Sequence, residues 1–371
     1  MAYWERMELL VFIVVLVALI LVHEFGHFVA AKLSGMRVDE FGIGFPPRAL
    51  RLGKRGETEY TLNWLPLGGF VKIYGEDGAG SADPRSFVMR PRILQAFTLV
   101  AGVAMNLFFA YVLITAALVA GTPRALSADE AARATHVQLA VADVLPGSPA
   151  APAGIQPGDI IARAMVGDAS FDGTSSADFS AFVAKDVAGA PVTLSVEHAD
   201  GSMGSVTVIP ATGLIPSDPS RKALGVEVST IGVISEALGP ALIDGAVLAW
   251  GATKLTAIGL AQFFAGVFTL HANLSQVAGP IGIAGAVGAA SSAGFGNLLS
   301  LMAVISINLA LINLIPIPAL DGGRLLFVLI EAVTRRPIKP VVAQAFNMVG
   351  FALILLLMAV VSVHDIFRIV S

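Results

Sequence analysis

The chain has 371 residues, of which 56% are hydrophobic and only 13% are charged, with a mean hydropathy of +0.79. A soluble protein carries charge on roughly 25% of its residues, so this composition excludes an ordinary soluble fold and indicates an integral membrane protein. The formal net charge of −4 gives no reason to expect a nucleic-acid partner, and the absence of cysteine excludes disulfides, iron–sulfur clusters and thiolate ligands. Any metal ion must therefore be held by His, Asp or Glu.

Four apolar segments are long enough to cross a bilayer, since a helix rises about 1.5 Å per residue. They cover residues 9–31, 93–120, 298–317 and 348–363. We interpret the first as a retained helix rather than a signal peptide, because residues 1–8 carry two Glu against one Arg. A further apolar segment, 241–270, is interrupted by Asp244, Lys254 and several glycines. We expect it to lie in the membrane interface, with a crossing helix as the alternative.

Basic residues are unevenly distributed between these segments. Residues 32–92 contain ten Lys and Arg, whereas the longer stretch 121–235 contains six. The positive-inside rule therefore predicts that 32–92 and 324–347 face the cytoplasm and that 121–235 lies outside, with both termini outside. The expected fold is an α-helical polytopic membrane protein with about four transmembrane helices and an inserted extracytoplasmic domain. The predicted domains are 1–120, 130–235 and 236–371.

The inserted domain is predicted to be β-rich. Its β-branched residues alternate in three stretches, 137–145, 191–198 and 204–211, as in half-buried strands. Gly and Pro turns separate the strands, and residues 211–222 are predicted to be a linker.

Two further short strands, 56–64 and 68–75, are predicted around the sequence LPLGG between the first two spans. They are unusually apolar for such a connection, so we expect a membrane-associated β-hairpin. In the membrane its edges must be satisfied by protein or by a water-filled cavity, and a surface hairpin is the alternative. Residues 79–86 are predicted to be a flexible loop.

An H-E-x-x-H motif, His23-Glu24-Phe25-Gly26-His27, lies inside the first apolar segment. Residues four apart share one face of a helix, so both imidazoles can bind one metal ion while Glu24 lies beside the bound water as general base. Ionisable groups in an apolar span are costly and are functional candidates by default. The motif therefore predicts a metal site.

Asp321 is the candidate for a third protein ligand. It is the only acidic residue between Asp244 and Glu331, and it follows the third span in INLIPIPALDGGRLL. A turn that ends a helix, with Gly322 and Gly323 as terminators, is the alternative role. A His–His–Asp set leaves a fourth position for water, the arrangement of a catalytic rather than a structural zinc.

Together these motifs closely resemble the site-2 protease family of intramembrane zinc metalloproteases, and within it the RseP-type branch with a PDZ domain. HEFGH and NLIPIPALDGG carry the resemblance, and further segments extend it over most of the chain. FGIGFPPRAL and EYTLNWLPLGGFVKIYGED are similar to a membrane-associated cytoplasmic segment, LPGSPAAPAGIQPGDII to a PDZ domain, and AGPIGIA (278–284) to the segment before the third core span. AGVAMN (101–106) resembles the family's A-G-P-x-x-N, with Val103 in place of proline.

The resemblance implies roles for individual residues. His23, His27 and Asp321 would hold Zn²⁺, with Glu24 as the base. Asn313, Pro316 and Pro318 match the family's N-x-x-P-x-P element. Both prolines would break the helix before Asp321, and Asn313 would contact the unwound substrate or the developing oxyanion, with a bond to a neighbouring helix as its alternative role. Asn106 and Asn308 rank lower, as polar contacts between helices.

Substrate capture requires an unwound segment, because a transmembrane helix hides its peptide bonds. Strand addition to the edge of the 58–74 hairpin, where Gly69 and Phe70 lie, would hold such a segment extended. Two departures from the branch are visible. Only one PDZ-like unit fits between the second and third spans, and Arg324 stands where His is expected.

The resemblance thus implies a membrane zinc endopeptidase that cleaves single-pass proteins within or near their transmembrane segment, after trimming by another protease. Anti-sigma factors and remnant signal peptides are the substrates it suggests, in the inner (plasma) membrane with the active site toward the cytoplasm. A non-proteolytic PDZ scaffold with a vestigial metal site is one alternative, and a zinc transporter is another. The intact His-Glu-His and Asp set argues against the scaffold, and the single concentrated site argues against the transporter.

Overall fold

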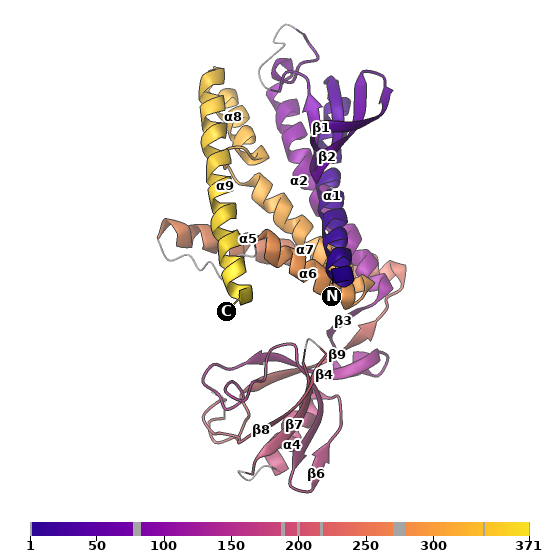
Figure 1. Ribbon diagram of the computed structural model, residues 1–371, viewed down its shortest axis with the longest axis vertical. Coiled ribbons are helices and arrows are strands. Elements are labelled where there is room, and N and C mark those ends of the chain that lie inside the picture. The colour runs from indigo at the N-terminus through magenta and orange to yellow at the C-terminus, as the bar shows by residue number, and fades with distance from the viewer. Residues whose placement is uncertain are drawn as a thin grey trace. The chain divides into compact units, whose positions relative to one another are not determined.

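The computed structural model describes residues 2–76, 83–186, 190–198, 201–215, 218–269, 279–336 and 338–370 (Figure 1). The chain forms two compact units. One combines Met1–Val119 with Ala237–Ser371, and the other is Ala120–Glu236.

The first unit is built on apolar helices. They are α1 (Ala2–Leu33), α2 (Arg92–Ala120), α5 (Leu238–Phe268), α6 (Pro280–Ser292), α7 (Phe295–Leu314), α8 (Asp321–Thr334) and α9 (Pro340–Val370). Among the described residues, five segments are long and apolar enough to cross a membrane: Leu9–Leu33, Arg92–Ala120, Leu238–Val267, Phe295–Leu314 and Val341–Val363. The chain therefore has the helices of a multi-pass membrane protein.

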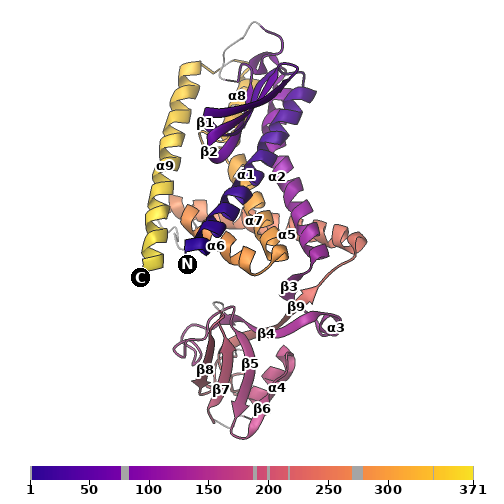
Figure 2. The same ribbon diagram turned by 45° about the vertical axis from the view of Figure 1, so that its right-hand side comes forward.

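The segment expected at the interface, 241–270, belongs to the continuous helix α5 as far as Phe268. By length and composition α5 qualifies as a fifth span. Both views show α5 running across the directions of α2 and α9 (Figures 1 and 2). The N-terminus, in α1, and the C-terminus, in α9, lie at the same end of this unit. By length and composition α5 is thus a possible fifth span, and its direction differs from those of α2 and α9.

The region around the expected third span differs from the prediction. The helix α7 ends at Leu314, three residues early, because Ile315 is extended (φ −66°, ψ 138°) and the prolines that follow have no N–H to donate. The stretch 324–347, expected to be a loop, is largely helical, since α8 covers its first half and α9 begins at Pro340. The stretch 278–284 contains the start of α6, with Ala278 outside the described residues.

The predicted hairpin around LPLGG is wrong. The two expected short strands form one long strand, β2 (Thr58–Ile73), which pairs with β1 (Val38–Arg55). The chain reverses earlier, at Gly56, whose φ of +62° favours glycine. Residues 40–43 of β1 pair with residues 69–72 of β2 on one side and with residues 59–62 of β2 on the other. The sheet is therefore larger than a hairpin, and residues 69–73 form a strand beside α1.

The helices α1 and α2 approach closely where the motif lies. A Cβ atom added to Gly26 would lie 2.4 Å from the carbonyl oxygen of Ala101, so only glycine fits this crossing. At its end, α1 is closed by Gly35 in the left-handed region (φ +69°), with the N–H of Met36 donating to the carbonyl of Ala31. The buried side chains Leu19, Ala110 and Ile307 join α1, α2 and α7 in one apolar core.

The second unit is a sheet with strand order β3-β9-β4-β5-β7-β8, in which β6 pairs with β5. Its strands are β3 (Thr122–Ala125), β4 (Thr135–Val144), β5 (Ile160–Val166), β6 (Ala169–Phe171), β7 (Val192–Glu197), β8 (Met203–Val208) and β9 (Val226–Ile234), with helices α3 (Ala128–Ala131) and α4 (Ser176–Asp186). The three strands expected from alternation correspond to β4, β7 and β8. The unit extends beyond 130–235 because β3 pairs with β9.

Two predicted connections fall partly outside the described residues. In the expected linker 211–222, Ala211 forms a bridge with Ala223, and residues 216–217 are not described. In the expected loop 79–86, residues 79–82 are not described, and a short 3₁₀ helix, Phe87–Met89, follows.

Candidate metal centre

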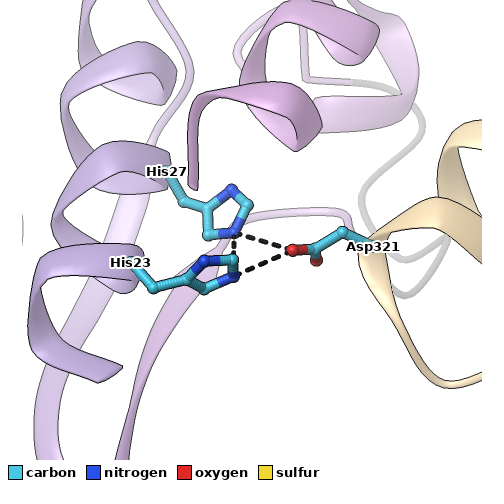
Figure 3. Close-up of side chains that lie close together, drawn as sticks. All are labelled: His23, His27 and Asp321. Carbon is cyan, nitrogen blue, oxygen red and sulfur yellow. Dashed lines mark hydrogen bonds and ion pairs between the residues drawn. The ribbon is translucent and has the colours of Figure 1, made fainter. Parts of the chain in front are cut away.

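The two histidines of the motif face Asp321 from one side of α1 (Figure 3). His23 Nε2 and His27 Nε2 lie 2.9 and 3.1 Å from Asp321 Oδ2. The two Nε2 atoms are 3.1 Å apart. Both histidines are buried. Three donor atoms from helices almost 300 residues apart in sequence thus converge on one point.

The orientation of the His27 ring is fixed by a contact with α2. Its Nδ1 lies 2.8 Å from the carbonyl oxygen of Thr98 on α2, an oxygen that can only accept a hydrogen bond. The proton of the neutral ring is therefore placed on Nδ1, and the lone pair of Nε2 points toward His23 and Asp321. This is the tautomer that a metal ligand requires.

Asp321 is the first residue of α8, held against the turn that ends α7. A Cβ atom on Gly322 would lie 2.2 Å from the carbonyl oxygen of Ile315, and one on Gly323 would lie 2.3 Å from that of Ile317. The two glycines therefore let the first turn of α8 pack directly on the extended backbone before it. They do not terminate a helix, which was the alternative reading of the LDGG sequence.

The donor set fits zinc. Structural chemistry gives zinc imidazole and carboxylate ligands at about 2.0–2.2 Å, which separates neighbouring ligand atoms in a tetrahedron by about 3.3 Å. The three donor atoms lie within 4.8 Å of one another. Three protein ligands are also the number found at catalytic zinc sites, where water takes the fourth position. His23, His27 and Asp321 would hold the ion.

Glu24 is held by the sheet. Its Oε2 accepts a hydrogen bond of 3.0 Å from the backbone N–H of Val71 in β2. Glu24 also lines a cavity of about 210 Å³ together with residues of α1, β1, β2, α7 and α8: Ile20, His23, Phe45, Gly69, Leu309, Asn313, Ala319, Leu320 and Asp321. The expected base, two of the candidate metal donors (His23 and Asp321) and Gly69 of β2 therefore line the same cavity.

The candidate substrate-binding residues divide between this cavity and its surroundings. Gly69 and Asn313 line it. Phe70 lies across Gly42, where a Cβ atom would meet its ring at 2.3 Å. Pro316 lines a separate apolar cavity of about 560 Å³ between α5 and the end of α7, and Pro318 packs against Gly350 of α9.

Three residues of α2 contact the histidines, and motif reading gave none of them this role. Thr98 meets His27, and Gly102 lies against both rings, since a Cβ atom there would be 2.4 Å from His27 Nε2 and 2.8 Å from His23 Cε1. Asn106 Nδ2 lies 3.4 Å from His23 Nδ1. Their spacing of four was a usable signal, because it places one stripe of small and polar side chains in an apolar span. Asn308 bonds the carbonyl of Val304 in its own helix.

Two ion pairs attach α8 to its neighbours. Arg324 pairs with Glu76, which follows β2, and Arg92 of α2 lies 2.8 Å from Glu331. Burial raises the pKa of the Glu76 carboxyl, and the Arg324 guanidinium opposes that shift. Arg324, the departure from the expected His, thus links the end of the sheet to the helix that begins with Asp321.

Comparison with known proteins gives the same picture as the geometry. The family model described as Peptidase family M50 matches residues 11–357. A protein of Clostridium perfringens named as a putative zinc metalloprotease is 36% identical over 356 residues, which cover 94% of this chain and 95% of that protein. A similarly named protein of Nostoc sp. is 34% identical over 94% of this chain and 93% of its own length. Another, of Brucella suis, is 31% identical over 96% of this chain and 94% of its own length. The chain therefore belongs to peptidase family M50, the site-2 protease family of zinc metalloproteases.

Proposed function

We propose that this protein is an intramembrane endopeptidase that cleaves single-pass membrane proteins within or near their transmembrane segment. The observation that carries the proposal is the position of the donor set. His23 and His27 lie within a 25-residue apolar segment of α1, so that a peptide bond reaching them must come from within or beside the membrane. Ionisable side chains are costly in an apolar segment, and a protease acting on soluble substrates would not need His23, Glu24 and His27 at this position.

The hydrolytic chemistry divides between the ion and the chain. Zinc, when bound, supplies a Lewis acid that acidifies water and polarises the peptide carbonyl. Glu24 takes the proton of the attacking water and gives it to the leaving nitrogen. The Val71 N–H fixes the carboxylate that performs both transfers. Asn313, which lines the same cavity, can donate to the substrate carbonyl.

The strand 69–73 is proposed to bind the substrate by strand addition. It runs beside α1, and Gly69 at its start lines the cavity that Glu24, His23 and Asp321 also line. An unwound substrate that adds to this edge would be extended and would present its backbone to the site. The remainder of the sheet exposes large apolar side chains, among them Trp64 (70% exposed) and Leu65 (50%), which favour insertion into the membrane.

The second unit is proposed to be a PDZ-like filter outside the cell membrane. A cavity of about 250 Å³ lies between α4 and β9, lined by apolar side chains such as Phe179, Val183 and Val226. Arg221 and Lys222 lie at the same cavity and would attract a free carboxylate. A chain end created by earlier cleavage would suit this groove, so substrates trimmed by another protease would be selected. Anti-sigma factors and remnant signal peptides are of this kind.

The proposed topology follows from charge and from the positions of the chain ends. The ten basic residues of 32–92 support a cytoplasmic position for that region, and the six basic residues of the longer stretch 121–235 support a position outside. With α5 along the interface, α1, α2, α7 and α9 cross, and both termini lie outside. The protein would then be a multi-pass component of the inner (plasma) membrane, with its active site toward the cytoplasm.

The test is cleavage of a tagged single-pass reporter, already trimmed on its outer side, by the full-length protein in membranes. Glu24→Gln should abolish cleavage while zinc content stays at one ion per chain, because the base is removed and the ligands remain. Cleavage that persists in Glu24→Gln would exclude Glu24 as the base. A wild-type protein that cleaves none of several trimmed reporters would favour a membrane scaffold. Zinc flux in proteoliposomes would favour a transporter.

A further inference from the structure

Asn106 contacts the ring nitrogen of His23 that does not face Asp321. Its side chain is fully buried on α2, and its Nδ2 atom lies 3.4 Å from Nδ1 of His23. Its Oδ1 atom is also buried, and within the described part of the chain it has no hydrogen-bond partner. A buried amide oxygen without a partner costs about 1–3 kcal/mol.

The chemistry of His23 constrains how the amide must point. The Nε2 atom of His23 faces Asp321 and His27, so it is the atom that must carry the lone pair for a metal ion. In a neutral imidazole the proton then resides on Nδ1, and a buried N–H needs an acceptor. The amide nitrogen of Asn106 cannot accept, whereas its oxygen can. A half-turn of the amide exchanges the two atoms without moving the backbone.

We propose that Asn106 is the positioning residue of His23, with Oδ1 accepting the Nδ1–H of the ring when the metal centre is formed. This hydrogen bond would select the tautomer that ligates through Nε2 and would fix the plane of the ring. It gives the buried oxygen its partner and gives the ring N–H its acceptor.

The arrangement matches the one already seen for the second histidine. His27 has its Nδ1 on the carbonyl of Thr98, so α2 would supply both acceptors. Thr98, Gly102 and Asn106 are spaced by four, which places them on one face of α2, and Gly102 leaves the room in which the two rings stand. Asn106 is itself anchored, because Ser306 Oγ of α7 donates to its backbone carbonyl at 2.9 Å.

The inference rests on the zinc site and not on the proposed intramembrane substrate, so it is tested without proteolysis. Zinc affinity would be measured on the purified full-length protein in detergent by competition with a chelator. Asn106→Leu, which removes the acceptor, should lower the affinity by about 10–100-fold, the usual effect of losing the partner of a ligating histidine. Asn106→Asp should retain the wild-type affinity or exceed it, since a carboxylate accepts the same bond. Asn308→Leu is the matched control, because Asn308 bonds only its own helix among the contacts described, and it should bind zinc as the wild type does.

A spectroscopic measurement gives the tautomer directly. In the zinc-loaded protein with ¹⁵N-labelled histidine, the ring of His23 should carry its proton on Nδ1, and this signal should be lost or exchange-broadened in Asn106→Leu and kept in Asn106→Asp. Unchanged zinc affinity in Asn106→Leu, or a tenfold loss in Asn106→Asp, would overturn the proposal. If Asn106→Leu does not fold, the outcome of Asn106→Asp decides by the same criterion. A wild-type protein that binds no zinc would overturn the metal centre together with this inference.

Discussion

The carboxylate of Glu24 accepts a hydrogen bond from the backbone N–H of Val71, so the proposed general base is held by the sheet rather than by another side chain. Val71 belongs to the strand 69–73, whose first residue, Gly69, lines the same cavity as Glu24. The strand proposed to hold the substrate and the carboxylate proposed to activate water are thus joined by one backbone contact. Any displacement of this strand would also displace the base.

Val71→Pro tests this contact, because proline has no N–H to donate. A hydrogen bond to a charged group contributes about 1.5–3 kcal/mol, so kcat should fall about tenfold or more while zinc stays bound. Val71→Ala keeps the N–H and is the matched control, and it should retain most of the wild-type rate. Equal losses in both variants would show that the side chain matters and the backbone contact does not.

Gly102→Ala should empty the metal centre. The added Cβ atom would lie 2.4 Å from His27 Nε2, which forces the ring away from its position. We expect zinc affinity to fall by at least about tenfold, the lower end of the range for disturbed ligand orientation. Gly259→Ala on α5 is the control, because it adds the same methyl group where nothing lies within 4 Å. This variant should bind zinc with the wild-type affinity. Zinc binding by Gly102→Ala at wild-type affinity would mean that the rings stand elsewhere.

The candidate metal donors could be identified from sequence because each lies in a short motif with a fixed chemical meaning. The spacing of His23 and His27 fixes a common helix face, and Asp321 is the one acid in a long apolar region. The structure brings these three residues together. Their partners on α2 were not predicted. Thr98 contacts His27 through its backbone carbonyl, and Gly102 makes room for the two rings because it has no side chain.

The sheet shows the opposite case. Alternation in 56–64 and 68–75 correctly predicts extended backbone, but it does not say which segments pair. LPLGG contains strong turn residues, yet the reversal occurs at Gly56 and the partner of the long strand is the preceding segment. Helix α8 was missed because it follows two prolines and has two glycines in its first turn, which is stabilised by packing on the turn at 315–317 rather than by propensity.

The ion pair between Arg324 and Glu76 should make stability depend on pH in a defined direction. Burial raises the pKa of Glu76, so the folded state favours the neutral carboxyl, and this contribution to stability is present below the ordinary value of 4.5 and lost as the pH rises through the raised pKa. Arg324 offsets that loss. Arg324→Gln should therefore lower the thermal stability of the metal-free protein at pH 7 and leave it nearly unchanged below pH 4.5.

The double variant Glu76→Gln/Arg324→Gln completes this test. It has no buried charge to leave unpaired, so it should recover part of the stability at pH 7, with a coupling of about 1 kcal/mol for a pair that is partly exposed. Additive effects of the two substitutions at pH 7 would contradict a functional ion pair.

Asp365, near the end of α9, should be needed for the attachment of α6. Its two carboxylate oxygens accept the backbone N–H groups of Gly279 and Gly282 at 3.3 and 2.9 Å, and Gly279 offers no capping side chain of its own. Asp365 thus caps a helix that begins some 80 residues earlier, where the N-terminal dipole favours a negative charge. Asp365→Ala leaves these buried donors without an acceptor and should cost about 1–3 kcal/mol. Asp365→Asn keeps one acceptor and should lose less. Thermal unfolding in detergent ranks the three proteins, and an Asp365→Ala variant as stable as the wild type would show that the contact contributes nothing.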